Sequence, residues 1–274
     1  MLSAAPPPAR SSPQPPYNAR SLTHRKRGRV VDCTGLENRQ RATVREFESH
    51  RFRQQLGISP DWVPMKTITF YLDFIWPYAY LAFEALPRSL KALPHRVEYK
   101  PVLFAAMLKH HGQLGPAEIA GKREWTYRQV LWQAQQLGVP LDLPHAHPFN
   151  PLSLLRLALA CSHAGETPHA VVETVFHHVW RGGGVADDAA RGQALVAHLA
   201  PRMGPDAPEV KQQLKANTDE AIARGVFGVP SLCVDDKVFW GLDALPMLQA
   251  YLAGDPWFDQ AWDAAAAIAP GVRR

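Results

Sequence analysis

The segment FYLDFIWPYAYLAF at residues 70–83 places a tryptophan and a proline where a predicted strand runs into a predicted helix. Backbone N–H groups and the positive end of the helix dipole meet at such a junction, which is why many α/β enzymes carry out their chemistry there. Asp73 and Trp76 stand beside this point. Asp73 either orients the turn or caps the helix, and Trp76 either covers a ligand or fills space between neighbouring side chains.

A second candidate site is the segment RGVFGVPS at residues 224–231, which directly precedes a short predicted strand. A cis peptide bond between Val229 and Pro230 would present the backbone N–H and C=O of Val229 to an extended, peptide-like ligand. Glutathione is a ligand of this kind. The position of this dipeptide in the order of predicted elements makes the cis bond an expectation for this chain.

The cysteines and histidines of the chain do not show the spacing of a redox or metal site. Cys33, Cys161 and Cys233 are far apart and form no CxxC pair, so neither a dithiol redox centre nor a cysteine metal site is predicted. Cys161 and Cys233 lie on apolar segments and are expected to be buried as small hydrophobic side chains. His145 and His147 lack further ligands at a fixed spacing, so no metal is expected there.

The charge distribution argues against a nucleic-acid partner. Residues 1–64 contain 11 Lys and Arg against 5 Asp and Glu, whereas residues 65–274 contain 19 against 20. The main part of the chain is therefore nearly neutral. No apolar run reaches the roughly 18–20 residues that a membrane-spanning helix needs, so no membrane partner is expected. The cysteine usage favours a reducing, intracellular compartment.

The first 64 residues form a separate problem. Residues 1–30 are rich in Pro, Arg and Ser without sustained apolar periodicity, a composition typical of a disordered segment. Three interpretations remain: a translation start placed too far upstream of Met65, an organellar targeting leader, and a genuine basic arm. The segment VVDCTGLENRQRATVREFESHRFRQQ also resembles the translation of a transfer-RNA gene. We therefore expect no functional residue within 1–64.

The remaining chain alternates between strand and helix signals. The opening elements predict a parallel β-α-β unit with a crossover helix. An amphipathic helix is expected to end at Gly138, and a hairpin turn is expected at Asp235-Asp236. The predicted elements are a strand at 66–74, a helix from Pro77, a strand at 95–104, several helices, a helix at 207–225, two short strands and a last helix.

Removing the central helices leaves the pattern β-α-β-α-β-β-α of thioredoxin. The predicted fold class is therefore α/β: a thioredoxin-like fold with a large inserted all-helical domain. The thioredoxin-like domain is expected to comprise residues 65–104 and 205–254. Residues 105–204 would form the inserted helical domain, and residues 255–274 a C-terminal tail.

Five segments carry a family resemblance, in the order FYLDFIWPYAYLAF, KPVLFAAMLKHHGQLGP, VFHHVWRGGG, RGVFGVPS and FWGLDAL. From about Met65 to Gly254, the chain resembles 2-hydroxychromene-2-carboxylate isomerases. Those enzymes are relatives of kappa-class glutathione transferases and of DsbA-like thioredoxin-fold proteins. The resemblance implies a cytoplasmic homodimer that uses glutathione and acts on a small aromatic molecule.

The resemblance also implies a glutathione site. The backbone of Val229, before Pro230, would pair with the tripeptide. Gly241 and Asp243 match positions that hold its γ-glutamyl end, and Trp240 and Leu242 flank them. A carboxylate and a helix N-terminus are suited to the two charges of an amino-acid head group.

The catalytic position of the family departs from its pattern. The family pattern D-F-x-S-P-[FY] has a serine before the proline, and here that position is Trp76. The implied reaction is glutathione-assisted isomerisation: addition of a thiolate, rotation about a bond and elimination. The alternatives are a kappa-like glutathione transferase or peroxidase, and a thioredoxin-fold binding protein that lacks catalysis. Lys109, Phe149 and Asn150 are the candidate substrate-binding residues; for Lys109 the alternative is a solvated helix end.

Overall fold

The computed structural model describes residues 65–163, 165–269 and 271; the predictions for residues 1–64 lie outside the described residues. In chain order the elements are β1 (Lys66–Leu72), α2 (Pro77–Ser89), β2 (His95–Pro101), α3 (Phe104–His110), the 3-10 helix η1 (Pro116–Glu118), α4 (Ala120–Leu137), α5 (Leu152–Ala160), α6 (His169–Trp180), α7 (Ala189–Leu199), α8 (Pro208–Ala223), β3 (Ser231–Val234), β4 (Lys237–Trp240), η2 (Leu242–Ala244), α9 (Leu245–Leu252), α10 (Trp257–Gln260) and η3 (Trp262–Ala267).

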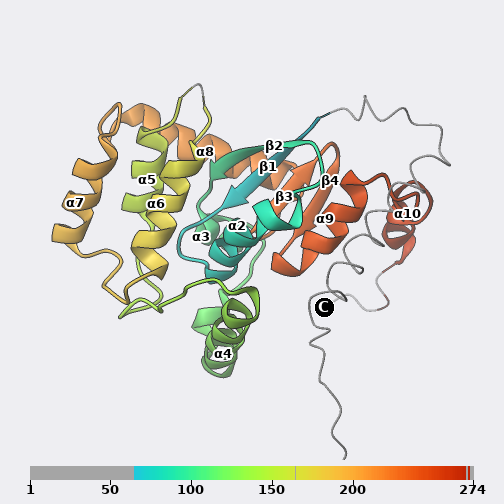
Figure 1. Ribbon diagram of the computed structural model, residues 1–274, viewed down its shortest axis with the longest axis horizontal. Helices are drawn as coiled ribbons and strands as arrows, with labels where there is room; N and C mark the ends of the chain where they lie inside the picture. Colours follow the sequence, from blue (N-terminus) through green and yellow to red (C-terminus); the bar gives the residue numbers. More distant parts are fainter. Residues whose placement is uncertain (1–64, 164, 270, 272–274) are drawn as a thin grey trace, which may run out of the picture. The chain divides into compact units, whose positions relative to one another are not determined.

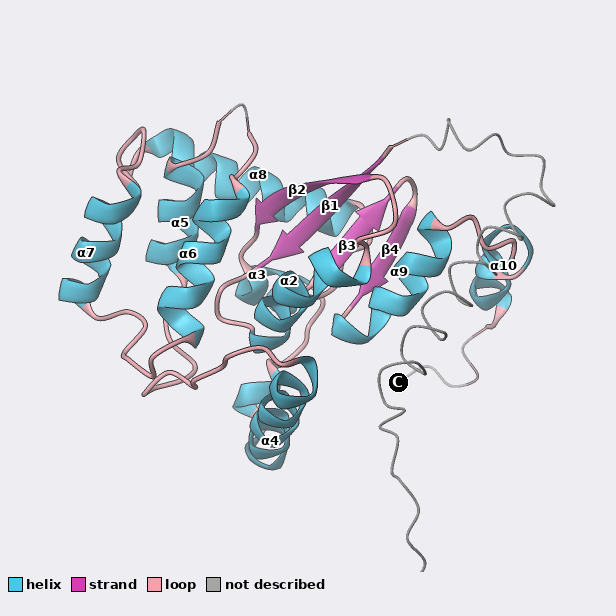
Figure 2. Ribbon diagram, in the orientation of Figure 1, coloured by secondary structure: helices cyan, strands magenta, loops and turns pink. Residues whose placement is uncertain are grey.

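A four-stranded sheet in the order β2-β1-β3-β4 forms the centre of the fold (Figure 2). Strands β1 and β2 are parallel and are joined by α2, so the predicted β-α-β opening is confirmed. Strand β3 runs antiparallel to β1, and β4 runs antiparallel to β3. The turn between β3 and β4 falls at Asp235-Asp236, as the sequence predicts, and Asp235 adopts a positive φ of 54°.

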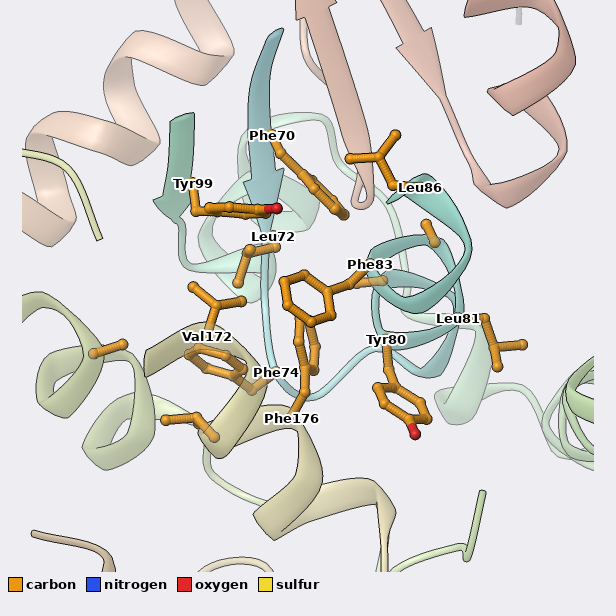
Figure 3. Close-up of a cluster of buried hydrophobic side chains, with 14 of the residues drawn as sticks. Phe70, Leu72, Phe74, Tyr80, Leu81, Phe83, Leu86, Tyr99, Val172 and Phe176 are labelled. Carbon is orange, nitrogen blue, oxygen red and sulfur yellow. The ribbon is translucent and has the colours of Figure 1, made fainter. Parts of the chain in front are cut away.

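The side chains of β1 alternate between two covered faces of the sheet. Ile68, Phe70 and Leu72 belong to the larger core, which also includes side chains of α2, α5, α6 and α9. Figure 3 shows part of this core, where Phe83 of α2 and Phe176 of α6 lie close together, with ring centroids 5.4 Å apart. Packing of these buried aromatic rings holds α2 against the sheet. It therefore also fixes the position of the first turn of α2.

The opposite face of the sheet carries a smaller core. Tyr71 of β1 packs there with side chains of α3 and α8, and Val229 and Cys233 lie in the same cluster. Thus β1 is covered on both faces, which explains why all its residues from Ile68 to Leu72 are buried, Thr69 included. The loop that contains Val229 is anchored to this core beside the sheet.

The chain between β2 and α8 is helical, and among its described residues the only β-structure consists of isolated bridges. Helix α6 packs against α2 and α5, and α5 packs against α8, so these helices share the larger core with the sheet (Figure 1). The predicted fold class, a thioredoxin-like fold with a helical insertion, is confirmed. The boundaries predicted for the individual domains stay a prediction.

Helix α4 is the part of the insertion that concerns the site. It ends at Gly138, which adopts a positive φ of 64°, so the predicted helix end is confirmed. A left-handed residue at this position is favourable for glycine because it has no Cβ. Helix α4 contacts η1 and α2.

The predicted C-terminal tail contains two short helices, α10 and η3. Phe258 and Trp262 place their rings 6.0 Å and 5.5 Å from the ring of Phe239 on β4. Packing of these aromatic rings on the β3–β4 hairpin explains why the segment forms helices. Its many alanine residues did not indicate this packing. Among the described residues, no helix combines the length and hydrophobicity that crossing a membrane requires.

Candidate active site

The turn between β1 and α2 is held by a buried carboxylate. Asp73 accepts hydrogen bonds from the backbone N–H groups of Ile75 (3.1 Å) and Phe104 (2.9 Å). Burial raises the pKa of Asp73 to about 7, against the effect of the surrounding backbone N–H donors. Asp73 therefore orients the turn and ties it to the start of α3. It does not cap α2, because the N-cap residue is Trp76, which makes no side-chain capping hydrogen bond.

Two more side chains, one fully buried and one half-buried, hold carbonyl groups of the same turn. Nε1 of Trp180 donates to the carbonyl of Phe74 at 3.0 Å. Nε2 of His147 lies 2.7 Å from the carbonyl oxygen of Ile75, and Nδ1 lies 2.7 Å from the hydroxyl of Tyr127. Burial lowers the pKa of His147, which fits a neutral ring that donates through Nε2 and accepts through Nδ1. Trp180 is fully buried, so its ring also packs in the larger core.

Trp76 stands at the beginning of α2 and is half-buried. Its carbonyl accepts from the N–H of Ala79 at 3.0 Å, and its N–H donates to the carbonyl of Asp73 at 3.2 Å. The indole ring lies 5.6 Å from the ring of Tyr78 and 5.7 Å from that of Phe104. These contacts leave the indole on the wall of a cleft, directly over the first turn of α2.

The loop before β3 contains the predicted cis peptide bond between Val229 and Pro230, which is confirmed. The carbonyl of Pro230 accepts from the N–H of Gly241 at 2.9 Å, which links this loop to the end of β4. Within the described part of the chain, no backbone hydrogen bond outside the helices and strands involves Val229. The peptide groups of Val229 are therefore available to a ligand in the cleft that this residue lines.

The segment after β4 depends on glycine. Gly241 has a φ of 98°, and a Cβ at this position would collide with Oδ1 of Asp243. The ring of Trp240 lies 4.9 Å from that of Phe227, and a Cβ at Gly228 would lie only 2.7 Å from Nε1 of Trp240. Both glycines thus permit close approach, so that the indole and the carboxylate reach the same cleft.

These pieces surround a cleft of about 490 Å³, a volume in the usual range for small-molecule sites. One part of its wall comes from the turn, α3, the loop before β3 and the segment after β4. The other part comes from η1 and α4. The lining residues are Trp76, Tyr78, Phe104, Leu108, Gln113, Leu114, Pro116, Lys122, Trp125, Thr126, Gln129, Gln133, Phe227, Gly228, Val229, Pro230, Trp240, Gly241, Leu242 and Asp243.

Helix α4 presents one continuous face to this cleft. The residues on this face follow helical spacing: Lys122, Trp125, Thr126, Gln129 and Gln133. The side-chain oxygen of Gln133 is buried and has no hydrogen-bond partner among the described residues. This face is mainly polar, with one exposed tryptophan ring, so it is suited to contacts with a ligand rather than to packing in the core.

A hydrogen bond connects the two parts of the wall. The hydroxyl of Tyr78, in the first turn of α2, donates to Oε1 of Gln129 on α4 at 2.8 Å. Burial, with a smaller contribution from the negative charge of Asp243, raises the pKa of Tyr78 to about 12. Tyr78 therefore stays protonated near neutral pH and acts as a hydrogen-bond donor.

The structure brings together most of the residues predicted for the site. Trp76 lines the cleft, and so do the six residues predicted to bind glutathione: Val229, Pro230, Trp240, Gly241, Leu242 and Asp243. The three predicted substrate-binding residues do not line it. Lys109 lies exposed near the end of α3.

Phe149 and Asn150 have other roles in the loop before α5. Phe149 is buried in the larger core, with its ring 5.9 Å from that of His147. Oδ1 of Asn150 accepts from the N–H of Leu152 at 3.1 Å, so this side chain holds the start of α5. Asn150 lines a different groove, which lies along α5 and α7.

The sequence did not indicate the residues that α4 contributes. It predicted the helix but not which face would meet the Val229–Pro230 loop, about a hundred residues later in the chain. A signal was present in its first turn, which contains Lys122 and Arg123 and no acidic residue. Cations are unfavourable at this end of a helix, so their presence there indicates a role beyond helix stability.

The described cysteines of the chain do not reach this cleft. Cys161 and Cys233 are both buried and unpaired, as predicted, and burial raises the pKa of Cys233 to about 11. The start of α2 carries Trp76 and Ala79 where a CxxC motif would have its two cysteines. No group of three or more potential metal ligands occurs among the described residues.

The fold is that of a known family. Residues 67–253 match the model of the DsbA-like thioredoxin domain, which covers more than half of the chain. The chain belongs to this family. Within the DsbA-like family, the solved structure of a 2-hydroxychromene-2-carboxylate isomerase superimposes with a TM-score of 0.60 at 23% identity. That match covers 74% of this chain and all of the other, and it supports the same fold.

Curated relatives of this DsbA-like chain fall into two groups. A 2-hydroxychromene-2-carboxylate isomerase of Sphingobium xenophagum is 30% identical over 68% of this chain and 98% of the relative. One from Pseudomonas putida is also 30% identical, over 67% and 92%. A kappa 2 glutathione S-transferase of Caenorhabditis elegans is 28% identical over 69% of this chain and 92% of the relative. The resemblance noted from the five segments is confirmed.

Proposed function

We propose that this protein is a glutathione-dependent isomerase of aromatic hydroxy/oxo acids of the 2-hydroxychromene-2-carboxylate type. One observation carries the proposal. A single cleft combines the start of α2, the loop of Val229 and Pro230, and the carboxylate of Asp243 with an aromatic wall. Relatives named as 2-hydroxychromene-2-carboxylate isomerases match two thirds of the chain, which favours this reaction over others that the fold supports.

The groups in the cleft fit glutathione. The free peptide groups of Val229 are suited to an extended tripeptide, which can pair with them as a strand does. The carboxylate of Asp243 suits the ammonium of a γ-glutamyl end. The first backbone N–H groups of η2 have no preceding turn to pair with and suit its carboxylate.

Bound in this way, glutathione would supply a thiol that adds to the conjugated side chain of the substrate, allows one bond to rotate and then leaves. The protein must keep the thiol sulfur over the start of α2, where the helix dipole favours a negative charge. Trp76 occupies the position of the family's serine and has no hydroxyl to donate. Losing one charge-assisted hydrogen bond removes about 1.5–3 kcal/mol of stabilisation from an anion, or about one to two pKa units.

The decisive experiment is to measure the isomerisation of 2-hydroxychromene-2-carboxylate by the full chain, with and without glutathione. The expected result is turnover that requires glutathione. This would mean that the helix terminus and the surrounding groups suffice without the serine. Glutathione binding without turnover of any substrate would instead favour a binding protein that has lost catalysis.

A kappa-like glutathione transferase or peroxidase is the second candidate. Its support is the similarity to a kappa-class enzyme, 28% identical over 211 residues. The two candidates are separated by giving the protein 1-chloro-2,4-dinitrobenzene, a neutral electrophile, or cumene hydroperoxide. Conjugation or reduction faster than isomerisation would favour the second candidate.

We also propose that the protein is a homodimer in the cytoplasm, as the family resemblance implies. Light scattering coupled to size-exclusion chromatography of the full chain tests the assembly. A mass of about twice that of one chain, 30.5 kDa, is expected. Cell fractionation with an antibody against the chain tests the location.

A further inference from the structure

The charges in the cleft are few and well separated along the chain. Among the described residues that line it, Lys122 is the only cation and Asp243 the only anion. Asp243 follows β4 in the thioredoxin-like part, whereas Lys122 lies in the first turn of α4, in the helical insertion. The cleft therefore has one group for a positively charged ligand atom and another for a negatively charged one.

We infer that α4 is the element that selects the substrate: Lys122 binds the carboxylate of an aromatic acid, and the indole of Trp125 stacks on its ring. This inference rests on the proposed function, in which Asp243 is assigned to the amino-acid end of glutathione. That assignment leaves Lys122 without a partner in glutathione's γ-glutamyl head. We assign it to the carboxylate of the second substrate rather than to the glycyl carboxylate of glutathione, and binding of 2-naphthoate in the absence of glutathione tests this choice. The role predicted for Lys109 passes to Lys122, since Lys109 does not line the cleft.

The surroundings of Lys122 support a ligand-binding role. Its side chain is exposed, and within the described residues it forms no ion pair with a carboxylate. Its position in the first turn places it beside the positive end of the helix dipole, which disfavours a cation. An incoming carboxylate would relieve that repulsion, because it would approach both the ammonium group and the helix terminus.

Trp125 supplies the apolar surface that such a substrate needs. It lies three residues after Lys122, on the same face of α4, and its side chain remains 62% exposed although it lines the cleft. Trp76 and Phe104, with ring centroids 5.7 Å apart, belong to the same lining. A flat, fused ring can lie against these aromatic groups with its carboxylate toward Lys122.

The helix contains matched control positions. Trp132 also lies on α4 and is 60% exposed, but it does not line the cleft. Lys109 is an exposed lysine on α3 that does not line the cleft either. Replacing these residues removes the same chemical groups at the surface without changing the proposed binding wall.

The test uses two probes with the same ring system, 2-naphthoate and its uncharged amide, 2-naphthamide, and measures their binding to the full chain by calorimetry. For Lys122→Gln we expect about tenfold weaker binding of 2-naphthoate, the loss of one partly solvated charge-assisted contact, with binding of 2-naphthamide unchanged. Trp125→Ala should weaken the binding of both probes to a similar extent. Lys109→Gln and Trp132→Ala should leave both affinities within about twofold of the original, because surface changes usually have small effects.

Three results would overturn the inference: equal weakening of both probes by Lys122→Gln, weakening by Lys109→Gln in its place, or no binding of 2-naphthoate by the unchanged protein. A separate titration with glutathione distinguishes this failure from failure of the proposed function. If glutathione does not bind but 2-naphthoate still depends on Lys122, the isomerase proposal fails while the recognition of aromatic acids by α4 stands.

Discussion

The two walls of the cleft are built in different ways. The turn before α2 is held by the buried side chains of Asp73 and Trp180 and the half-buried ring of His147, which each hydrogen-bond its backbone. The face of α4 carries Lys122 and Trp125, both exposed, and neither side chain hydrogen-bonds another group in the described part of the chain. A rigid wall fixes the position of the reacting atoms, whereas a wall of exposed side chains can change its specificity at little cost in stability. The site thus separates the position of the chemistry from the choice of substrate.

This difference between the two walls predicts a large loss of stability when one tryptophan is replaced by alanine and a small loss when another is. Trp180→Ala removes a fully buried ring that donates to the carbonyl of Phe74, so it should lower the free energy of unfolding by about 3–5 kcal/mol. Trp125→Ala should change it by no more than about 0.5 kcal/mol, because the ring is exposed. Urea denaturation of the full chain measures both. Similar losses in the two variants would show that α4 is as much a part of the stable framework as the turn.

Trp76 belongs to the wall that the turn before α2 forms, and its replacement should change the rate of catalysis. Trp76→Ser restores the hydroxyl that the family pattern has before Pro77 and should raise glutathione-dependent kcat/KM about tenfold, in line with a shift of about one pKa unit in the thiol. Trp76→Ala is the control, since it opens the same space without a hydroxyl. The value to report is the ratio of the glutathione-dependent kcat/KM of Trp76→Ser to that of Trp76→Ala. A ratio near one would mean that the start of α2 does not contact the thiol.

His147 should make the rigid wall sensitive to pH. Burial lowers its pKa below the ordinary value of 6.5, while the hydrogen bond to Ile75 acts in the opposite direction. As the pH falls below about 6.5, the unfolded chain binds a proton before the folded one, so stability present above this pH is lost. The loss from this one group is limited to about 1.4 kcal/mol per pH unit.

The measurement for His147 compares melting temperatures of the original protein and of His147→Gln between pH 7.5 and pH 5. Glutamine can donate and accept as the neutral ring does but does not titrate. Other titrating groups, including Asp73, contribute equally to both proteins and cancel in the difference. As the pH falls, the melting temperature of the original protein should decrease more steeply than that of His147→Gln. Parallel curves would contradict the assignment of a neutral, half-buried ring to this position.

The same contrast explains which features the sequence could predict. Local signals gave the framework: Pro77 at a helix start, Gly138 at a helix end and Asp235-Asp236 at a hairpin turn are each determined by the conformational preferences of a few neighbouring residues. The order of these elements was enough to predict the fold and the cis bond before Pro230.

Long-range contacts determined the rest. Lys109 and Lys122 both lie near helix ends, and only the path of the chain through η1 decides which of them reaches the cleft. Phe149 resembled a loop residue near the site, but packing against His147 buries it. Exposed residues such as Trp125 leave no apolar periodicity to interpret. The wall that chooses the ligand is therefore harder to predict than the wall that positions it.

The smallest expected effect concerns the hydrogen bond that joins the two walls. The hydroxyl of Tyr78 donates to Gln129 at 2.8 Å, and Tyr78→Phe and Gln129→Ala each remove it. If the bond holds α4 in place, a double-mutant cycle should give a coupling energy of about 0.5–1.5 kcal/mol in the free energy of unfolding. The binding of 2-naphthoate should weaken by less than about tenfold in either variant, since Lys122 and Trp125 remain.

Thr126→Val provides the control for this cycle, because its hydroxyl donates within α4 to the carbonyl of Lys122 at 2.8 Å and not across to α2. Paired with Tyr78→Phe, it should show a coupling energy near zero. A coupling of the same size for both pairs would mean that the two walls communicate through the packing of the whole helix. In that case the freedom of α4 to change its specificity would be smaller than the exposure of Lys122 and Trp125 implies.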